Sequence, residues 1–154
     1  MRTSIGIVVT MAVLLLVAVP DYSAALEEEQ MKTFCTEKKD ADQCFALGEK
    51  YRTVEMNNTA ALEYFTLGCN LDHMTSCVHA GILTQQKGAQ NSPEWKTAAD
   101  LYQKACDQHH DRACFNLGTL KYKEGRASKA KELFELACEY GNKIACENLK
   151  KLVK

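Results

Sequence analysis

The sequence predicts an all-α protein built as a solenoid of helical hairpins, and three observations support that prediction. A motif consisting of an apolar helix end, a cysteine, a polar turn, a second cysteine and a new apolar helix start occurs four times. The first cysteines of successive motifs lie 32 to 37 residues apart, a period typical of stacked helical hairpins. No stretch alternates apolar and polar residues for long enough to predict a strand.

The four motifs cover residues 31–48, 65–81, 102–118 and 134–150. The last two share an aromatic residue, two Ala-Cys pairs and an Asn-Leu pair. The first motif is looser, because it has one extra residue between its cysteines. With 154 residues, 46% of them hydrophobic and 25% charged, the chain has the composition of one ordinary globular domain.

The N-terminal segment has the layout of a secretory signal peptide. Arg2 precedes an apolar run over residues 5–19, and small residues follow as far as Ala25. The run is short for a membrane-spanning helix, which needs about 20 residues. We predict a signal peptide over residues 1–25, a repeat domain over residues 26–154, a secreted or periplasmic location and no stable membrane insertion after cleavage. An uncleaved signal anchor is the alternative.

All eight cysteines lie after the predicted signal peptide, and an even number in an exported chain indicates a disulfide framework. The repeat indicates that each cysteine bonds its partner within the same motif. Zinc sites and redox pairs use closer cysteines than these, so we expect no metal and no cofactor. The predicted disulfides are Cys35–Cys44, Cys69–Cys77, Cys106–Cys114 and Cys138–Cys146.

Capping residues and apolar periodicity place the helices of the first half of the chain. The first opens with Glu27 to Glu29, whose charges suit a helix N-terminus. Asn57 and Asn58 mark the turn and cap before the third. In the second, Gly48 allows a neighbouring helix to approach closely. These helices are expected over residues 26–38, 42–53, 59–70 and 76–86.

In the second half, Ser92 caps a helix that has Pro93 at its first position, which is favourable for proline. Asp111 and Asn142 are expected to cap two further helices, and Ala127 or Ser128 opens the helix between them. These helices are expected over residues 92–106, 111–125, 127–140 and 143–153. We expect a total of seven helices after the signal peptide.

The motifs resemble a known family. The Leu-Gly or Ala-Gly pair after the second cysteine and the Ala-rich helices that end in Ala-Cys resemble Sel1-like repeats, over residues 34–149. The paired cysteines are similar to those of the Helicobacter cysteine-rich proteins. The resemblance implies a right-handed, TPR-like α/α solenoid that binds a protein or peptide on its concave face. For the cysteine-rich subgroup it also implies penicillin binding with weak β-lactamase activity. Lys150 departs from the pattern, since it occupies the position of the glycine.

One position of the motif predicts a binding site. The residues two places after the second cysteines are Ala46, His79, Asn116 and Asn148. If the helices after these cysteines line the concave face, the side chains form a row, and asparagine can hold a peptide main chain because it both donates and accepts. We therefore predict binding residues Asn116, His79 and Asn148. The alternative interpretation is a ladder of solvent-facing polar residues.

The other polar and aromatic residues are expected to be structural. His73, His109 and His110 are predicted to be solvated turn residues. Tyr51 and Tyr122 are expected to pack between helices.

The sequence offers no complete catalytic constellation, and no catalytic residue is predicted. Ser128 to Lys131 reads Ser-x-x-Lys, as in penicillin-recognising serine enzymes, but the Ser-Asp-Asn and Lys-Thr-Gly partner motifs are absent and Ser128 is expected to cap a helix. The net charge of −1 argues against a nucleic-acid partner.

We expect an interaction module for a protein or peptide. The alternative is a weak β-lactamase-like hydrolase that binds a β-lactam or peptidoglycan-like ligand. A third hypothesis is an immunity or inhibitor protein against an envelope-acting toxin.

Overall fold

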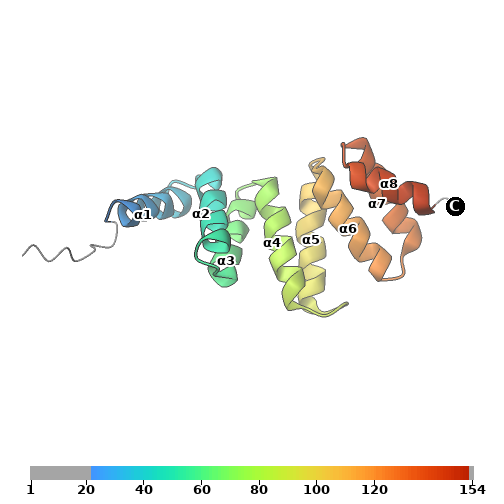
Figure 1. Ribbon diagram of the computed structural model, residues 1–154, viewed down its shortest axis with the longest axis horizontal. Coiled ribbons are helices and arrows are strands. Elements are labelled where there is room, and N and C mark those ends of the chain that lie inside the picture. The colour runs from blue at the N-terminus through green and yellow to red at the C-terminus, as the bar shows by residue number, and fades with distance from the viewer. Residues whose placement is uncertain (1–21, 153–154) are drawn as a thin grey trace, which may run out of the picture.

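The computed structural model describes residues 22–152, and this part of the chain forms eight α-helices and no strand. The helices stack one after another into an elongated array that runs from α1 at one end to α8 at the other (Figure 1). The predicted all-α fold class is confirmed. The expected total of seven helices is one too low, although all eight lie in segments predicted to be helical. The helices are α1 (Tyr22–Thr36), α2 (Ala41–Thr53), α3 (Asn58–Asn70), α4 (Met74–Lys87), α5 (Pro93–Asp107), α6 (Asp111–Lys123), α7 (Ala127–Glu139) and α8 (Lys143–Leu152).

The signal-peptide prediction falls almost entirely outside the described residues. The predicted cleavage position after Ala25 lies in the first turns of α1, at an exposed residue. The signal peptide and the boundary at residue 26 therefore stay predictions. No helix among residues 22–152 is long and apolar enough to cross a membrane.

All four predicted disulfides are present. Each joins the end of an odd-numbered helix to the first turn of the next helix, with Cα atoms 4.5 to 4.8 Å apart. The first three are buried, whereas Cys138 and Cys146 are half-buried. Because each bond spans one turn between helices, it fixes the angle at which the chain leaves one helix and enters the next.

A glycine in each of three even-numbered helices receives an aromatic ring from the following helix. The pairs are Gly48 with Phe65, Gly81 with Tyr102, and Gly118 with Phe134. A Cβ atom at Gly81 would lie 2.5 Å from the ring of Tyr102, so a larger residue does not fit unless the ring moves. This explains the Leu-Gly and Ala-Gly pairs of the motif. We call this contact the glycine–ring contact; Lys150, at the matching position of α8, cannot form it.

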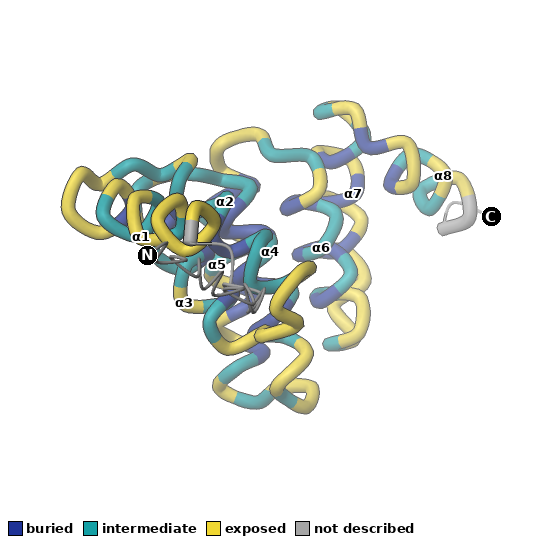
Figure 2. The backbone as a smooth tube through the Cα atoms, turned by 60° about the vertical axis from the view of Figure 1, so that its left-hand side comes forward, coloured by how far each residue is buried: buried dark blue, intermediate teal, exposed yellow. Residues whose placement is uncertain are grey.

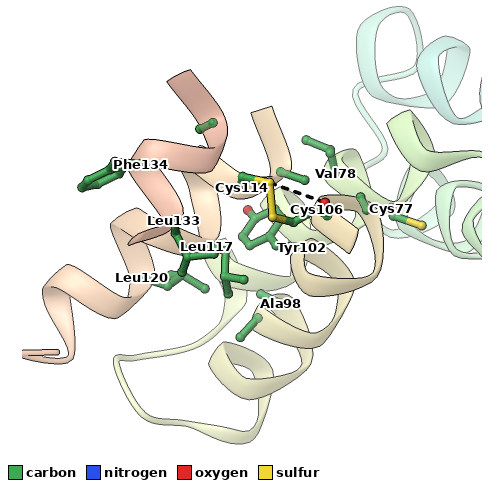
Figure 3. Close-up of a cluster of buried hydrophobic side chains, with 14 of the residues drawn as sticks. Cys77, Val78, Ala98, Tyr102, Cys106, Cys114, Leu117, Leu120, Leu133 and Phe134 are labelled. Carbon is green, nitrogen blue, oxygen red and sulfur yellow. Dashed lines mark hydrogen bonds between the residues drawn. A yellow bond between two sulfur atoms is a disulfide. The ribbon is translucent and has the colours of Figure 1, made fainter. Parts of the chain in front are cut away.

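The core runs along the seams between the helices, while outward faces and loops are exposed (Figure 2). Its largest cluster surrounds the Cys106–Cys114 disulfide, where Tyr102 of α5 lies beside Leu117 of α6 (Figure 3). Tyr102 is fully buried, and its hydroxyl donates to Gln85 Oε1 at 3.1 Å. Stability is therefore distributed over successive helix pairs rather than held in one central core.

The predicted caps Ser92 and Asn142 are confirmed, the cap before α3 is Asn57 with Asn58 as the first helical residue, and two predicted caps are wrong. Side-chain oxygens of Asn57, Ser92 and Asn142 accept backbone N–H bonds at the starts of α3, α5 and α8. Asp111 and Ser128 do not cap, because each already lies inside its helix. The residues before α6 and α7 are His110 and Arg126, and neither makes a side-chain cap bond.

The predicted packing roles of two tyrosines have opposite outcomes. Tyr51 stacks on Tyr64 with ring centroids 5.3 Å apart, as expected. Tyr122 is 54% exposed, so the prediction that it packs between helices is wrong.

At the α1 end, Glu28 joins the first two helices. Its carboxylate pairs with Lys32 at 2.7 Å and with Lys50, and it accepts the Tyr51 hydroxyl at 2.6 Å. The hydrogen bonds from Lys32, then from Lys50 and Tyr51, lower the pKa of Glu28 from 4.5 to about 2. A depressed carboxyl pKa means that this network stabilises the fold above pH 4.5 and is lost as the pH falls toward 2.

Glu28→Gln is expected to be less stable than the wild type at neutral pH, because the amide cannot pair with both lysines. The difference should close as the pH falls from about 4.5 to about 2, where wild-type Glu28 also becomes neutral. Urea unfolding at a series of pH values measures this, with Glu27→Gln, an exposed neighbour, as the control. A difference that does not change with pH would contradict the assigned network.

Candidate functional site

The four residues of the predicted row lie one on each of α2, α4, α6 and α8, whose shared surface we call the even-helix face. Ala46, His79, Asn116 and Asn148 are all half-buried. The first two helices of this set touch directly, since the Phe45 ring of α2 lies 5.6 Å from the His79 ring of α4. The repeat therefore brings the motif position to one side of the stack, but the surroundings differ from helix to helix.

His79 is engaged by its own chain. Its Nδ1 lies 2.9 Å from Glu49 Oε1, and its ring lies 4.9 Å from Phe65. Glu49 is also held by Arg52, whose Nε and Nη2 donate at 3.1 and 2.7 Å. With its side chain only 15% exposed, His79 mainly ties α2 to α4.

Burial lowers the pKa of His79, while the charge of Glu49 opposes this and those of Arg52 and Arg112 reinforce it. The imidazole is therefore neutral at pH 7 and donates from Nδ1 to the carboxylate. The pKa of Glu49 is lowered chiefly by its hydrogen bonds from Arg52. Glu49 thus makes one full ion pair with Arg52 of its own helix and one neutral hydrogen bond with His79 across to α4.

Asn116 lies in a different environment, an open hollow of about 470 Å³ between α6 and α8. We call this the α6–α8 hollow. Within residues 22–152 the Asn116 amide has no hydrogen-bond partner. Phe115 supplies a half-buried ring, and Ile144 is 58% exposed. The lining residues are His110, Asp111, Arg112, Phe115, Asn116, Asn142 and Ile144.

Asn148 does not line the α6–α8 hollow, although it belongs to α8 and is half-buried. Of the three predicted binding residues, Asn116 lines this hollow, His79 contacts Glu49 of its own chain, and Asn148 lies farther along α8. Their joint use as a binding row stays a prediction.

Two of the three histidines predicted to be solvated are half-buried. His73 Nδ1 accepts the Ser76 N–H at 3.1 Å and so caps α4. His110 precedes α6, and its Nδ1 is buried with no hydrogen-bond partner among the described residues. Burial lowers the pKa of His110, which is therefore neutral at pH 7. Only His109 is an exposed turn residue, as predicted.

A pattern in the sequence could have predicted two of the residues that line the hollow, His110 and Asn142. The residue four places before each second cysteine directly precedes an even-numbered helix. His110 and Asn142 are equivalent in this way to the cap residues Asp40 and His73. Alignment of the motifs on their cysteines thus indicates that His110 and Asn142 directly precede α6 and α8, the two helices that line the hollow.

The Ser-x-x-Lys segment is separate from the hollow. Ser128 and Lys131 are exposed on α7, and Lys131 lies 3.8 Å from Glu135. Neither residue lines the hollow that contains Asn116. Residues 22–152 contain no group of three or more His, Cys, Asp or Glu side chains placed to hold a metal ion.

Charge is divided unevenly along the stack. Residues 26–110 carry 8 Lys and Arg against 13 Asp and Glu, a net charge of −5. Residues 111–154 carry 10 basic against 6 acidic residues, a net charge of +4. The overall charge of −1 therefore conceals an acidic N-terminal part and a basic C-terminal part, and the α6–α8 hollow lies in the basic part.

Two solved structures resemble this architecture. A Sel1 repeat protein from Oxalobacter formigenes aligns with a TM-score of 0.65 over 81% of this chain and 98% of its own, at 19% identity. Helicobacter pylori cysteine rich protein B aligns with a TM-score of 0.56 over 79% and 96%, at 21% identity. The chain has the Sel1-repeat fold. The predicted disulfide-clipped solenoid is thereby confirmed as its fold class.

Curated relatives also share sequence with this chain. Cytochrome c oxidase assembly factor 7 of Xenopus tropicalis is 28% identical over 138 residues, which are 80% of this chain and 59% of that protein. The Homo sapiens protein of the same name is 29% identical over 118 residues, 71% of this chain and 50% of that protein. The chain thus spans 50 to 59% of the length of these relatives. No family model matches the sequence.

Proposed function

We propose that this chain is a protein-interaction scaffold that binds an extended segment of a partner protein at the α6–α8 hollow. The observation that supports this most is the Asn116 amide, which is half-buried and has no hydrogen-bond partner within residues 22–152. An amide can donate to a carbonyl and accept from an N–H of the same bound main chain. Phe115 and Ile144 beside it offer apolar contact for a side chain of that segment.

The described part of the chain contains four disulfides and no free cysteine, which favours a location in an oxidising compartment. The predicted signal peptide favours a secreted or periplasmic location. A second candidate function follows from the curated relatives, whose name describes assembly of cytochrome c oxidase. In that function the scaffold would hold a component of the oxidase, or another assembly protein, during assembly.

Asn116→Ala is expected to weaken capture of the natural partner roughly tenfold, since one buried hydrogen-bonding group is worth about 1–3 kcal/mol. The oxidised protein serves as bait in its own compartment, with cross-linking before lysis. Asn70→Ala is the matched control, because Asn70 is an exposed asparagine on an odd-numbered helix. If both variants capture the same proteins in the same amounts, the proposed site is wrong.

The identity of the captured proteins separates the candidate functions. Oxidase components would favour the assembly role, and an envelope-acting toxin would favour the immunity hypothesis. Penicillin binding is tested separately with a fluorescent penicillin, because Ser128 and Lys131 lie on α7 outside the hollow. Covalent label that Ser128→Ala abolishes would favour the β-lactamase alternative, and absence of label and turnover would remove it.

A further inference from the structure

We propose that the segment bound in the α6–α8 hollow is acidic, with an Asp or Glu side chain next to an apolar residue, and that Arg112 is the ion-pair partner of that carboxylate. This inference rests on the proposed function, because it specifies the chemistry of the partner at the same hollow.

Arg112 is the first support. It lines the hollow from the first turn of α6, it is exposed, and it makes no ion pair within residues 22–152. By contrast, Arg52 is paired with Glu49 at 2.7 Å, and Arg126 lies 3.7 Å from Glu124. The guanidinium presents a planar fork of donors that matches a carboxylate. Arg112 is therefore a cation available to an external acid.

The other charged group that lines the hollow, the Asp111 carboxylate, makes a hydrogen bond within the chain. Asp111 Oδ2 accepts a hydrogen bond from Asn142 Nδ2 at 3.1 Å, which directs that carboxylate toward the start of α8. His110 lies beside it, with its Nδ1 3.9 Å from Asp111 Oδ1. The sequence from residue 111 to 154 carries a net charge of +4, which favours association with an acidic segment over a basic one.

The apolar residues that line the hollow favour a peptide over a small anion as its ligand. Ile144 is 58% exposed, and Phe115 packs against Phe134 with ring centroids 5.6 Å apart, so the apolar wall is held in place. A small anion would use only the guanidinium of Arg112. A peptide supplies a carboxylate for Arg112, a main chain for Asn116 and an apolar side chain for Ile144 together.

The test is selection of random linear peptides displayed on phage against the oxidised protein, followed by fluorescence anisotropy on the enriched peptides. We expect an acidic residue beside Leu, Ile or Phe in these peptides. Arg112→Gln should weaken their binding roughly tenfold, as expected for loss of a charge-assisted pair. Arg126→Gln removes the same charge from an exposed loop and should change the affinity less than about twofold.

A charge-reversal variant separates two explanations for the lower peptide affinity of Arg112→Gln, loss of the ion pair and misfolding. Arg112→Glu should bind the same peptides better when Lys replaces their acidic residue, which an unfolded protein cannot do. Enriched peptides without acidic residues, or equal binding by Arg112→Gln, would overturn this inference and leave the scaffold function standing. No enrichment over an unrelated control protein would overturn both.

Discussion

Tyr102→Ala is expected to lower the free energy of unfolding by about 3–5 kcal/mol, the range for truncating a large buried aromatic residue. Tyr102 is fully buried at the centre of the largest core cluster and forms the middle glycine–ring contact with Gly81. Its loss leaves a cavity between α4 and α5, and α6 packs against the same cluster. The expected result is a stack that separates at its centre at low denaturant.

Urea unfolding followed by circular dichroism measures the effect. Tyr122→Ala is the matched control, because Tyr122 is 54% exposed and its truncation removes little buried area. Tyr102→Phe keeps the ring and removes only the bond to Gln85, so it should cost about 1 kcal/mol. If Tyr102→Ala were as stable as Tyr122→Ala, the glycine–ring contact would not hold α4 and α5 together.

Removing the Cys106–Cys114 disulfide, by replacing both residues with alanine, is expected to cost about 2–3 kcal/mol in the chain-entropy model. The two residues are buried between α5 and α6, where the cross-link restricts the unfolded chain over a short loop. A helix pair in the middle of a stack contacts neighbours on both sides, so its loosening also weakens their contacts.

The Cys138–Cys146 pair gives a matched comparison. It closes a loop of the same sequence separation, 8, but it is half-buried and joins α7 to α8 at the end of the described stack. Its double alanine variant should unfold with a smaller loss of stability and with fraying of α8 alone, visible by hydrogen exchange. Equal losses in both variants would mean that position in the stack does not matter.

The sequence predicts the fold well because the signals for this fold are local. A cysteine pair, a turn and two apolar helix ends lie within 17 residues in motifs such as 102–118, so the helix order and all four disulfides follow from the repeat. The wrong caps, Asp111 and Ser128, lie one and two residues past the true cap positions, because the residues chosen were better hydrogen-bond acceptors than His110 and Arg126, which precede the helices.

The candidate site could be predicted only in part. Asn116 follows from the motif alignment, but the hollow around it joins residues from α6 and α8 that lie about 30 positions apart in the chain. The contact between His79 and Glu49 could not be predicted for the same reason, because it crosses from α2 to α4. Contacts between one motif and the next depend on how the helices pack, and a motif read by itself does not contain that information.

The glycine–ring contact also bears on how such a chain can change its length during evolution. Each internal segment from one ring to the residue before the next ring, such as 65–101 or 102–133, carries a ring for the helix before it and a glycine for the helix after it. Duplicating or deleting one complete segment therefore leaves every remaining ring matched to a glycine, whereas an insertion of partial length does not. Lys150 lacks the glycine, so growth by duplication is compatible with the contact only upstream of α8.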